Sequence, residues 1–145
     1  EKRRLNLLRV LMEAPNVLIL DEPTNGLDIP SKSIFRRLLA TYVNEERLII
    51  ISTHQVADVE QLLDSIIILD EIGVALNATT EEICRKIKFG KIDENDKVIY
   101  SERTIVGDVA VSVNETDVDT PLNIELLFNA TTANRNAIAA LFNTK

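Results

Sequence analysis

The apolar residues of this chain fall into short uninterrupted runs, with a helical stripe between the first two. Residues 17–20 and residues 48–51 are each four consecutive apolar residues, the pattern of a short strand buried on both faces of a parallel sheet. A third apolar strand is predicted over 65–69. Between the first two runs, a stripe at helical spacing predicts a helix packed on the core through Ile34, Phe35, Leu38, Leu39, Tyr42 and Val43. The runs indicate an α/β fold with parallel core strands.

Capping residues set the ends of two predicted helices. Asp28 can cap a helix that Pro30 starts, because the missing N–H group of proline costs nothing in a first turn. Thr79 and Glu82 have the spacing of a capping box, which predicts a helix that continues through Lys88.

The pattern changes after residue 88. A charged connector over 91–97 is followed by a strand-like segment at 98–100 and by alternating valines over 109–113. Two short helices are predicted near the end of the chain, the first starting at Pro121. This part of the sequence contains no nucleophile–base pair, metal-ligand cluster or glycine-rich loop, so we interpret it as a small α+β appendage.

Composition and charge narrow the possible function classes. The net charge is −7, from 23 acidic and 16 basic residues, which argues against a general nucleic-acid binder. Cys84 is the only cysteine, so neither an intramolecular disulfide nor a cysteine metal cluster is possible. No apolar run approaches membrane-spanning length and no signal peptide is present. We therefore expect a globular protein of a reducing, cytoplasmic compartment.

Two carboxylates follow the first apolar run. Asp21 and Glu22 stand at the carboxyl end of a predicted parallel strand, where ligands bind in open α/β sheets, and Pro23 prevents the strand from continuing. A hard metal ion needs oxygen ligands at a rigid position, and a hydrolytic water needs a base beside it. The pair Asp21 and Glu22 supplies both kinds of group.

The whole segment resembles a known motif. Residues 17–28 read Val-Leu-Ile-Leu-Asp-Glu-Pro-Thr-Asn-Gly-Leu-Asp and resemble the Walker B motif and D-loop of ABC-type ATPases. The resemblance implies that Asp21 holds Mg²⁺ and that Glu22 polarises or deprotonates the attacking water. It also implies that the D-loop residues lie near the nucleotide and communicate across a dimer of ATPase domains: Asn25, Gly26, Leu27 and Asp28.

The only histidine extends this resemblance. His54 lies 32 residues after Glu22, at the end of the second apolar run and before a short helix predicted over 55–64. Residues 51–54, Ile-Ser-Thr-His, resemble the switch (H-loop) segment of the same family. The resemblance implies that His54 contacts the γ-phosphate of ATP and steadies Glu22.

Other motifs of the family are missing or incomplete. Glu1 resembles the fifth position of the signature motif, which implies a contact with nucleotide across the dimer. The glycines at 26, 73, 90 and 107 are isolated, so no Walker A phosphate loop can be written from them. We therefore interpret residues 1–88 as the C-terminal part of an ABC ATPase domain, a partial P-loop NTPase fold, and residues 89–145 as an α+β extension.

The family architecture predicts an incomplete sheet. In that architecture the Walker A strand lies between the strands that correspond to residues 48–52 and 65–70. Their unpaired edges would be costly and would favour pairing with another chain. We expect either strand exchange between two copies, giving a homodimer, or a rearranged sheet.

The resemblance implies an ATP-binding and ATP-hydrolysing subunit of an ABC transporter. ATP and Mg²⁺ would be the cofactors, and the partners would be a second ATP-binding subunit and membrane permease subunits on the cytoplasmic face. These 145 residues alone would be inactive without a Walker A loop.

Two alternatives stay open. A ribosome-associated ABC translation factor usually has His where this chain has Gly26, and Ser-His-Asp-Arg where it has residues 52–55, Ser-Thr-His-Gln. Both differences favour the transporter. The second alternative is a non-catalytic interaction module.

Overall fold

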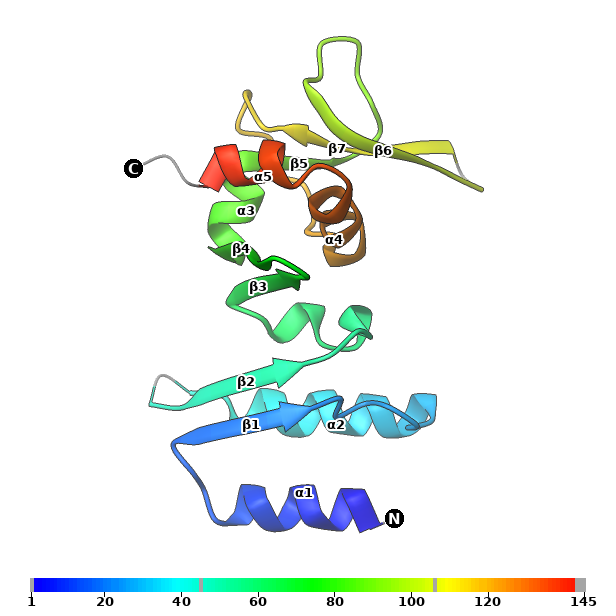
Figure 1. Ribbon diagram of the computed structural model, residues 1–145. Coiled ribbons are helices and arrows are strands. Elements are labelled where there is room, and N and C mark those ends of the chain that lie inside the picture. Colours follow the sequence, from blue (N-terminus) through cyan, green and yellow to red (C-terminus); the bar gives the residue numbers. More distant parts are fainter. Residues whose placement is uncertain (1, 45, 106, 143–145) are drawn as a thin grey trace. The chain divides into compact units, whose positions relative to one another are not determined.

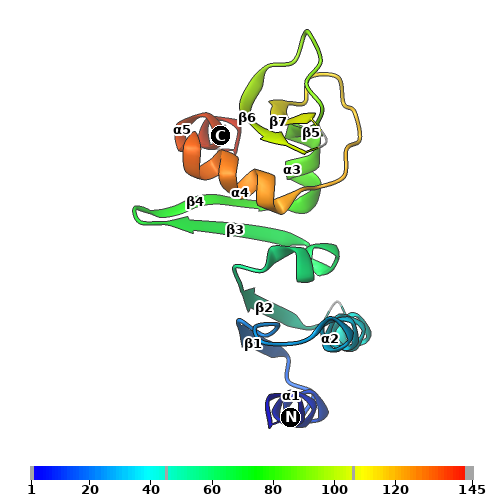
Figure 2. The same cartoon turned by 90° about the vertical axis from the view of Figure 1, so that its right-hand side faces the viewer.

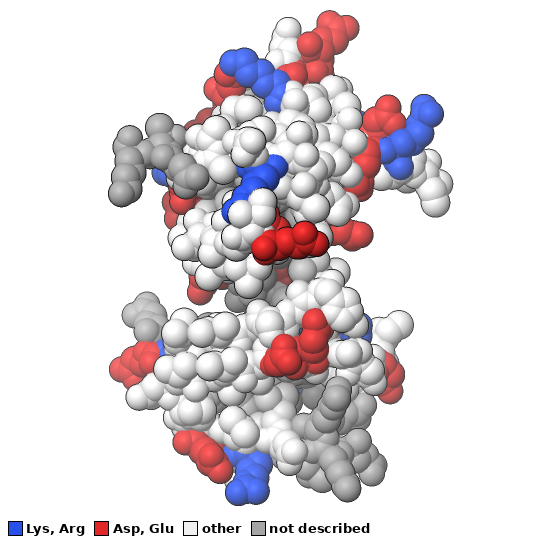
Figure 3. All heavy atoms as spheres, in the orientation of Figure 1, with Lys and Arg blue, Asp and Glu red and all other residues white. Residues whose placement is uncertain are grey.

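The computed structural model describes residues 2–44, 46–105 and 107–142. The chain divides into two compact units, residues 1–62 and residues 63–145, and each unit is described by itself. No helix in the described ranges is long and apolar enough to cross a membrane. On the face drawn in Figure 3, the acidic and basic side chains of the described residues are scattered, without a continuous basic patch.

The first unit contains one pair of parallel strands. Its elements are α1 (Lys2–Met12), β1 (Val17–Asp21), α2 (Ile29–Tyr42), β2 (Leu48–Ser52) and two short 3₁₀-helices, η1 (Val56–Asp58) and η2 (Glu60–Leu62). β1 and β2 lie side by side and point the same way (Figure 1), with residue 17 opposite 48 and residue 21 opposite 52. The predicted parallel pair is confirmed as part of a mixed α/β fold, whereas the partial P-loop NTPase fold stays a prediction.

The predicted burial of both strand faces is wrong. Leu18 is 3% exposed, but its neighbour Ile19 is 69% exposed, and Val17, Leu48 and Ile50 are exposed as well. Successive side chains of a strand point to opposite faces, and within this unit α2 covers only one of them. A continuous apolar run therefore does not establish that both faces are covered.

The stripe on α2 is buried in part. Phe35, Leu39 and Tyr42 belong to the core, whereas Ile34 and Val43 are exposed. Tyr42 is fixed by a hydrogen bond from its hydroxyl to the carbonyl oxygen of Pro15 at 2.7 Å. The buried side of α2 is thus narrower than the predicted stripe.

The second unit contains a hairpin, a three-stranded sheet and three helices. Its elements are β3 (Ser65–Asp70), β4 (Gly73–Thr79), α3 (Thr80–Lys86), β5 (Ile87–Gly90), β6 (Val98–Thr104), β7 (Gly107–Val113), α4 (Ile124–Ala133) and α5 (Arg135–Phe142). β3 pairs with β4, and the second sheet has the antiparallel order β5-β7-β6. Figure 2 shows α4 running along the hairpin, in agreement with the contacts of α4 and α5 with β4.

Several predicted boundaries move. Thr79 accepts a hydrogen bond from the backbone N–H of Glu82 at 3.1 Å, so the predicted cap is confirmed. The helix through Lys88 is wrong, because α3 ends at Lys86 and Ile87 already pairs with β7. The helix predicted from Pro121 begins at residue 124, and the helix predicted over 55–64 is replaced by η1 and η2.

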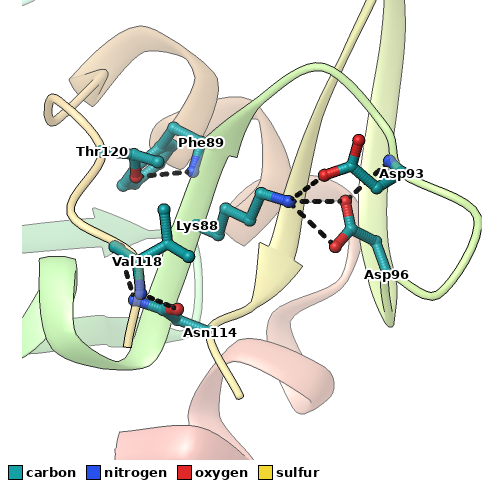
Figure 4. Close-up of polar contacts among 7 residues, drawn as sticks. All are labelled: Lys88, Phe89, Asp93, Asp96, Asn114, Val118 and Thr120. Atoms are coloured by element: carbon teal, nitrogen blue, oxygen red, sulfur yellow. Dashed lines mark hydrogen bonds and ion pairs between the residues drawn. The ribbon is translucent and has the colours of Figure 1, made fainter. Parts of the chain in front are cut away.

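Two loops of the second unit are fastened by side chains (Figure 4). Lys88 Nζ lies 2.6 Å from Asp93 Oδ2 and 3.1 Å from Asp96 Oδ1. Asn114 donates to the carbonyl oxygen of Val118 at 2.9 Å and accepts from its N–H at 3.0 Å. The connector predicted over 91–97 is therefore a loop held against β5.

β2 and β3, the strands for which unpaired edges are predicted, each have one partner strand in the described part of the chain. Among the described strands, β2 pairs only with β1 and β3 pairs only with β4. Strand exchange and a rearranged sheet both stay predictions. The division at 88 between ATPase part and extension also stays a prediction, since the compact units divide the chain at a different place.

Candidate functional site

The carboxyl ends of β1 and β2 bring two polar segments together. Asp21, the last residue of β1, is opposite Ser52, the last residue of β2. The hydroxyl of Ser52 donates to Asp21 Oδ1 at 2.6 Å. Asp21 is exposed, so its carboxylate is accessible at the strand end.

Glu22 continues from β1 in an unusual conformation. Its φ is 44°, in the left-handed region that residues other than glycine adopt rarely. Its backbone N–H donates to the carbonyl oxygen of Ser52 at 2.8 Å, which fixes the turn. Backbone strain of this kind is often found at functional positions.

The side chain of Glu22 faces the segment after β2. Glu22 Oε1 lies 2.6 Å from His54 Nδ1 and accepts from the backbone N–H of His54 at 3.1 Å. Glu22 Oε2 accepts from the hydroxyl of Thr53 at 3.2 Å. The hydrogen bond with the His54 side chain lowers the pKa of Glu22 below its ordinary value, and the hydrogen bonds from the His54 backbone N–H and the Thr53 hydroxyl lower it further. The structure thus joins the two residues for which catalytic roles are predicted.

The D-loop segment forms a tight turn before α2. Gly26 has a φ of 72°, which glycine adopts without strain, and the N–H of Leu27 donates to the carbonyl oxygen of Thr24 at 3.1 Å. Asp28 caps α2 by accepting from the N–H of Ser31 at 3.0 Å, as predicted. Asn25 and Gly26 are exposed. A nucleotide contact for residues 25–28 stays a prediction, and Glu1 lies outside the described residues.

Ser52 and Thr53 were given no role by the sequence reasoning. The equal spacing of the two apolar runs could have indicated the contact of Ser52, because parallel strands in register place residue 52 opposite residue 21. The contact of Thr53 with Glu22 depends on the path of the loop, for which the sequence carries no comparable signal.

An apolar groove of about 550 Å³ lies beside β1 in the first unit. It is lined by Leu7 and Val10 of α1, by Leu18, and by Ile34 and Leu38 of α2. The described residues that line it include no Lys or Arg. No group of three or more His, Cys, Asp or Glu residues that could hold a metal ion occurs in the described part of the chain.

Sequence comparisons place these residues in a family context. No family model matches the chain. An uncharacterized ABC transporter ATP-binding protein of Methanocaldococcus jannaschii is 31% identical over 101 residues, 70% of this chain and 38% of that protein. A bacitracin transport ATP-binding protein of Bacillus licheniformis is 36% identical over 108 residues, 70% of this chain and 35% of that protein.

A third relative gives the same indication over a shorter stretch. Nod factor export ATP-binding protein I of Burkholderia orbicola is 39% identical over 70 residues, 48% of this chain and 23% of that protein. The chain spans between about a quarter and two fifths of the length of these relatives. Over the matched residues it is a homologue of ABC transporter ATP-binding proteins and carries part of an ABC ATPase nucleotide-binding domain.

Proposed function

We propose that the protein to which these residues belong is the ATP-hydrolysing subunit of an ABC transporter. The observation that supports this most is the 2.6 Å contact between Glu22 and His54 at the end of a parallel strand pair. A carboxylate and an imidazole at a strand end are suited to positioning a water for attack on a phosphate.

Glu22 acts on this water as an ionised group. A glutamate is ionised at neutral pH, and the hydrogen bonds from His54 and Thr53 lower the pKa of Glu22 further, so the carboxylate accepts hydrogen bonds. Glu22 polarises the attacking water or takes its proton as the bond to phosphorus forms. His54 holds the Glu22 carboxylate through its ring Nδ1 and its backbone N–H.

The end of β1 fits a magnesium ion that is shared with a nucleotide. Mg²⁺ in phosphoryl-transfer sites uses one or two carboxylates and completes its shell with phosphate and water. Asp21 is exposed and offers a carboxylate held by Ser52, which suits this role. When bound, Mg²⁺ would neutralise charge on the phosphate oxygens.

The wider assembly follows from the same proposal. Transport would need membrane permease subunits and a second ATP-binding subunit. Glu1 and the D-loop residues, Asn25 to Asp28, would act at the interface between the two ATP-binding subunits. The protein would lie at the cytoplasmic face of the membrane. The 145 residues alone would not bind Mg-ATP tightly, because the four glycines form no phosphate loop.

The test compares variants of the full-length parent protein. Glu22→Gln is expected to lower the rate of Mg-ATP hydrolysis about 10²–10⁴-fold while ATP binding is retained. Glu46→Gln makes the same chemical change at an exposed position of the same unit and should leave the rate unchanged. Hydrolysis at the wild-type rate by the Glu22→Gln variant would refute the assigned role. Tight Mg-ATP binding by the 145-residue chain in calorimetry would mean that the phosphate site lies elsewhere.

A further inference from the structure

A polar network joins α2 to the segment that follows His54. Lys32, in the first turns of α2, has its Nζ 2.7 Å from Asp58 Oδ2 in η1. The same Nζ donates to Gln55 Oε1 at 2.8 Å. Arg36, one turn further along α2, lies 3.7 Å from Asp58 Oδ1. Two cations of α2 thus face one carboxylate of η1.

Asp58 is held as a charged group in a largely buried position. Its side chain is 14% exposed, and this burial alone would raise its pKa. The Lys32 ammonium, the Thr24 hydroxyl and the Arg36 guanidinium outweigh burial, so the pKa of Asp58 is lower than usual. A buried charge that has lost one partner is costly, so this network fixes the geometry of η1 on α2.

The network reaches the segment that carries His54. Thr24, which is fully buried, stands two residues after Glu22. Gln55 directly follows His54, and its N–H donates to the hydroxyl of Thr53 at 2.9 Å. His54 is therefore adjacent in sequence to Gln55, a residue that Lys32 holds.

Packing does not hold the His54 ring. The side chain is 69% exposed, so few neighbours restrict its rotation. The anchors nearest to it in the chain are Thr53, bonded to Glu22, and Gln55 with Asp58, bonded to α2.

We propose that Lys32 and Asp58 are positioning residues, which hold η1 on α2 and thereby keep the His54 ring in contact with Glu22. A role of this arrangement in catalysis rests on the proposed function. The contact itself is a property of the 145-residue chain and is measurable without ATP.

Because His54 is the only histidine, its imidazole signals in a ¹⁵N NMR spectrum need no further assignment. A carboxylate only accepts, so in the wild type the proton of this contact sits on Nδ1. We expect Lys32→Met and Asp58→Asn to remove the hydrogen-bonded Nδ1 signature and to give ring shifts like those of Glu22→Gln. Lys32→Arg should restore the wild-type shifts.

Two further variants keep the test decisive. Arg9→Met removes a cation from the exposed Arg9–Glu13 pair of the same unit and should leave the His54 signals unchanged. Lys32→Gln removes the charge while keeping a donor for Gln55, so it disturbs the fold less than Lys32→Met and should still lose the signature. Wild-type His54 signals in a folded Lys32→Gln or Asp58→Asn variant would overturn the proposal.

Kinetics of the full-length parent separate this proposal from the proposed function. Lys32→Met should lower kcat by about tenfold or more with little change in KM for Mg-ATP, because the ring is misplaced rather than removed. A wild-type parent without hydrolysis would refute the ATPase function and leave the NMR result valid. If the parent hydrolyses ATP normally and Lys32→Met leaves the rate unchanged, only the positioning role of Lys32 and Asp58 is refuted.

Discussion

The core of the second unit offers a direct test of the burial in α4. Leu127 is 0% exposed, whereas the next residue, Phe128, is 47% exposed on the same helix. Replacing a fully buried Leu by Ala costs about 2–5 kcal/mol of unfolding free energy, from lost transfer free energy and a residual cavity. Phe128→Ala removes more atoms, but about half of the ring is already in water. Since full burial of Phe is worth about 1.5–3 kcal/mol, we expect a loss of about 1 kcal/mol.

The two variants should therefore differ by more than the error of a denaturation experiment. For a unit of this size each kcal/mol lowers Tm by about 4–8 °C, so Leu127→Ala should lower Tm by at least about 8 °C. Urea unfolding followed by circular dichroism gives the free energies, and Leu127→Met serves as a milder variant with a cost below about 1.5 kcal/mol. An equal or larger loss for Phe128→Ala would refute the placement of α4.

Three further predictions concern polar contacts. Asp28→Ala should cost about 1 kcal/mol through loss of the α2 cap, and Asp28→Ser should keep most of it, as measured by thermal unfolding. The N–H of Asp93 and the Lys88 ammonium lower the pKa of Asp96, so its stabilisation is present above the unfolded value of about 3.9 and is lost as pH falls below it. Asp96→Asn should flatten the dependence of the urea midpoint on pH below about 4. Arg135→Met removes an ion pair to the β3–β4 hairpin and should speed amide hydrogen exchange at the hairpin turn, whereas an unchanged rate would contradict the contact.

The sequence predicted elements better than it predicted their surroundings. The apolar runs predicted β1 and β2, and the capping residues predicted the starts of α2 and α3. A run such as 17–20 records only that the side chains are apolar, and it is silent on whether a second layer covers the exposed Ile19. A capping box likewise marks where α3 starts and not where it ends. The alternation of apolar residues at Ile87 and Phe89, both buried in β5, is the sequence pattern that indicates a strand after α3.

Some residues of the candidate site could likewise be predicted from the sequence, and others could not. Glu22 and His54 could be singled out because each belongs to a motif-like segment, 17–28 and 51–54, although their contact depends on the parallel register of two strands. Lys32 and Asp58 could not be singled out, since a charged residue near a helix start and another in a short turn normally indicate a solvated surface. Only the fold brings them within 2.7 Å.

The β3–β4 hairpin lies between the two places at which this chain can be divided, residue 62 by compact units and residue 88 by the predicted resemblance. The predicted relationship to ABC ATPases runs through β3 and β4, yet these strands bury Ile66, Ile68 and Leu76 within the compact unit that also contains α4 and α5. Contacts of α4 with β3 and of α5 with β4, together with the bond from Arg135 to Asp70, cover the inner face of the hairpin. A two-stranded ribbon alone is marginally stable in water, and in this unit the packing of α4 and α5 adds to the core of the hairpin. Among the described residues, α4 and α5 therefore belong to the same compact unit as the hairpin, while the division of the chain at residue 88 stays a prediction.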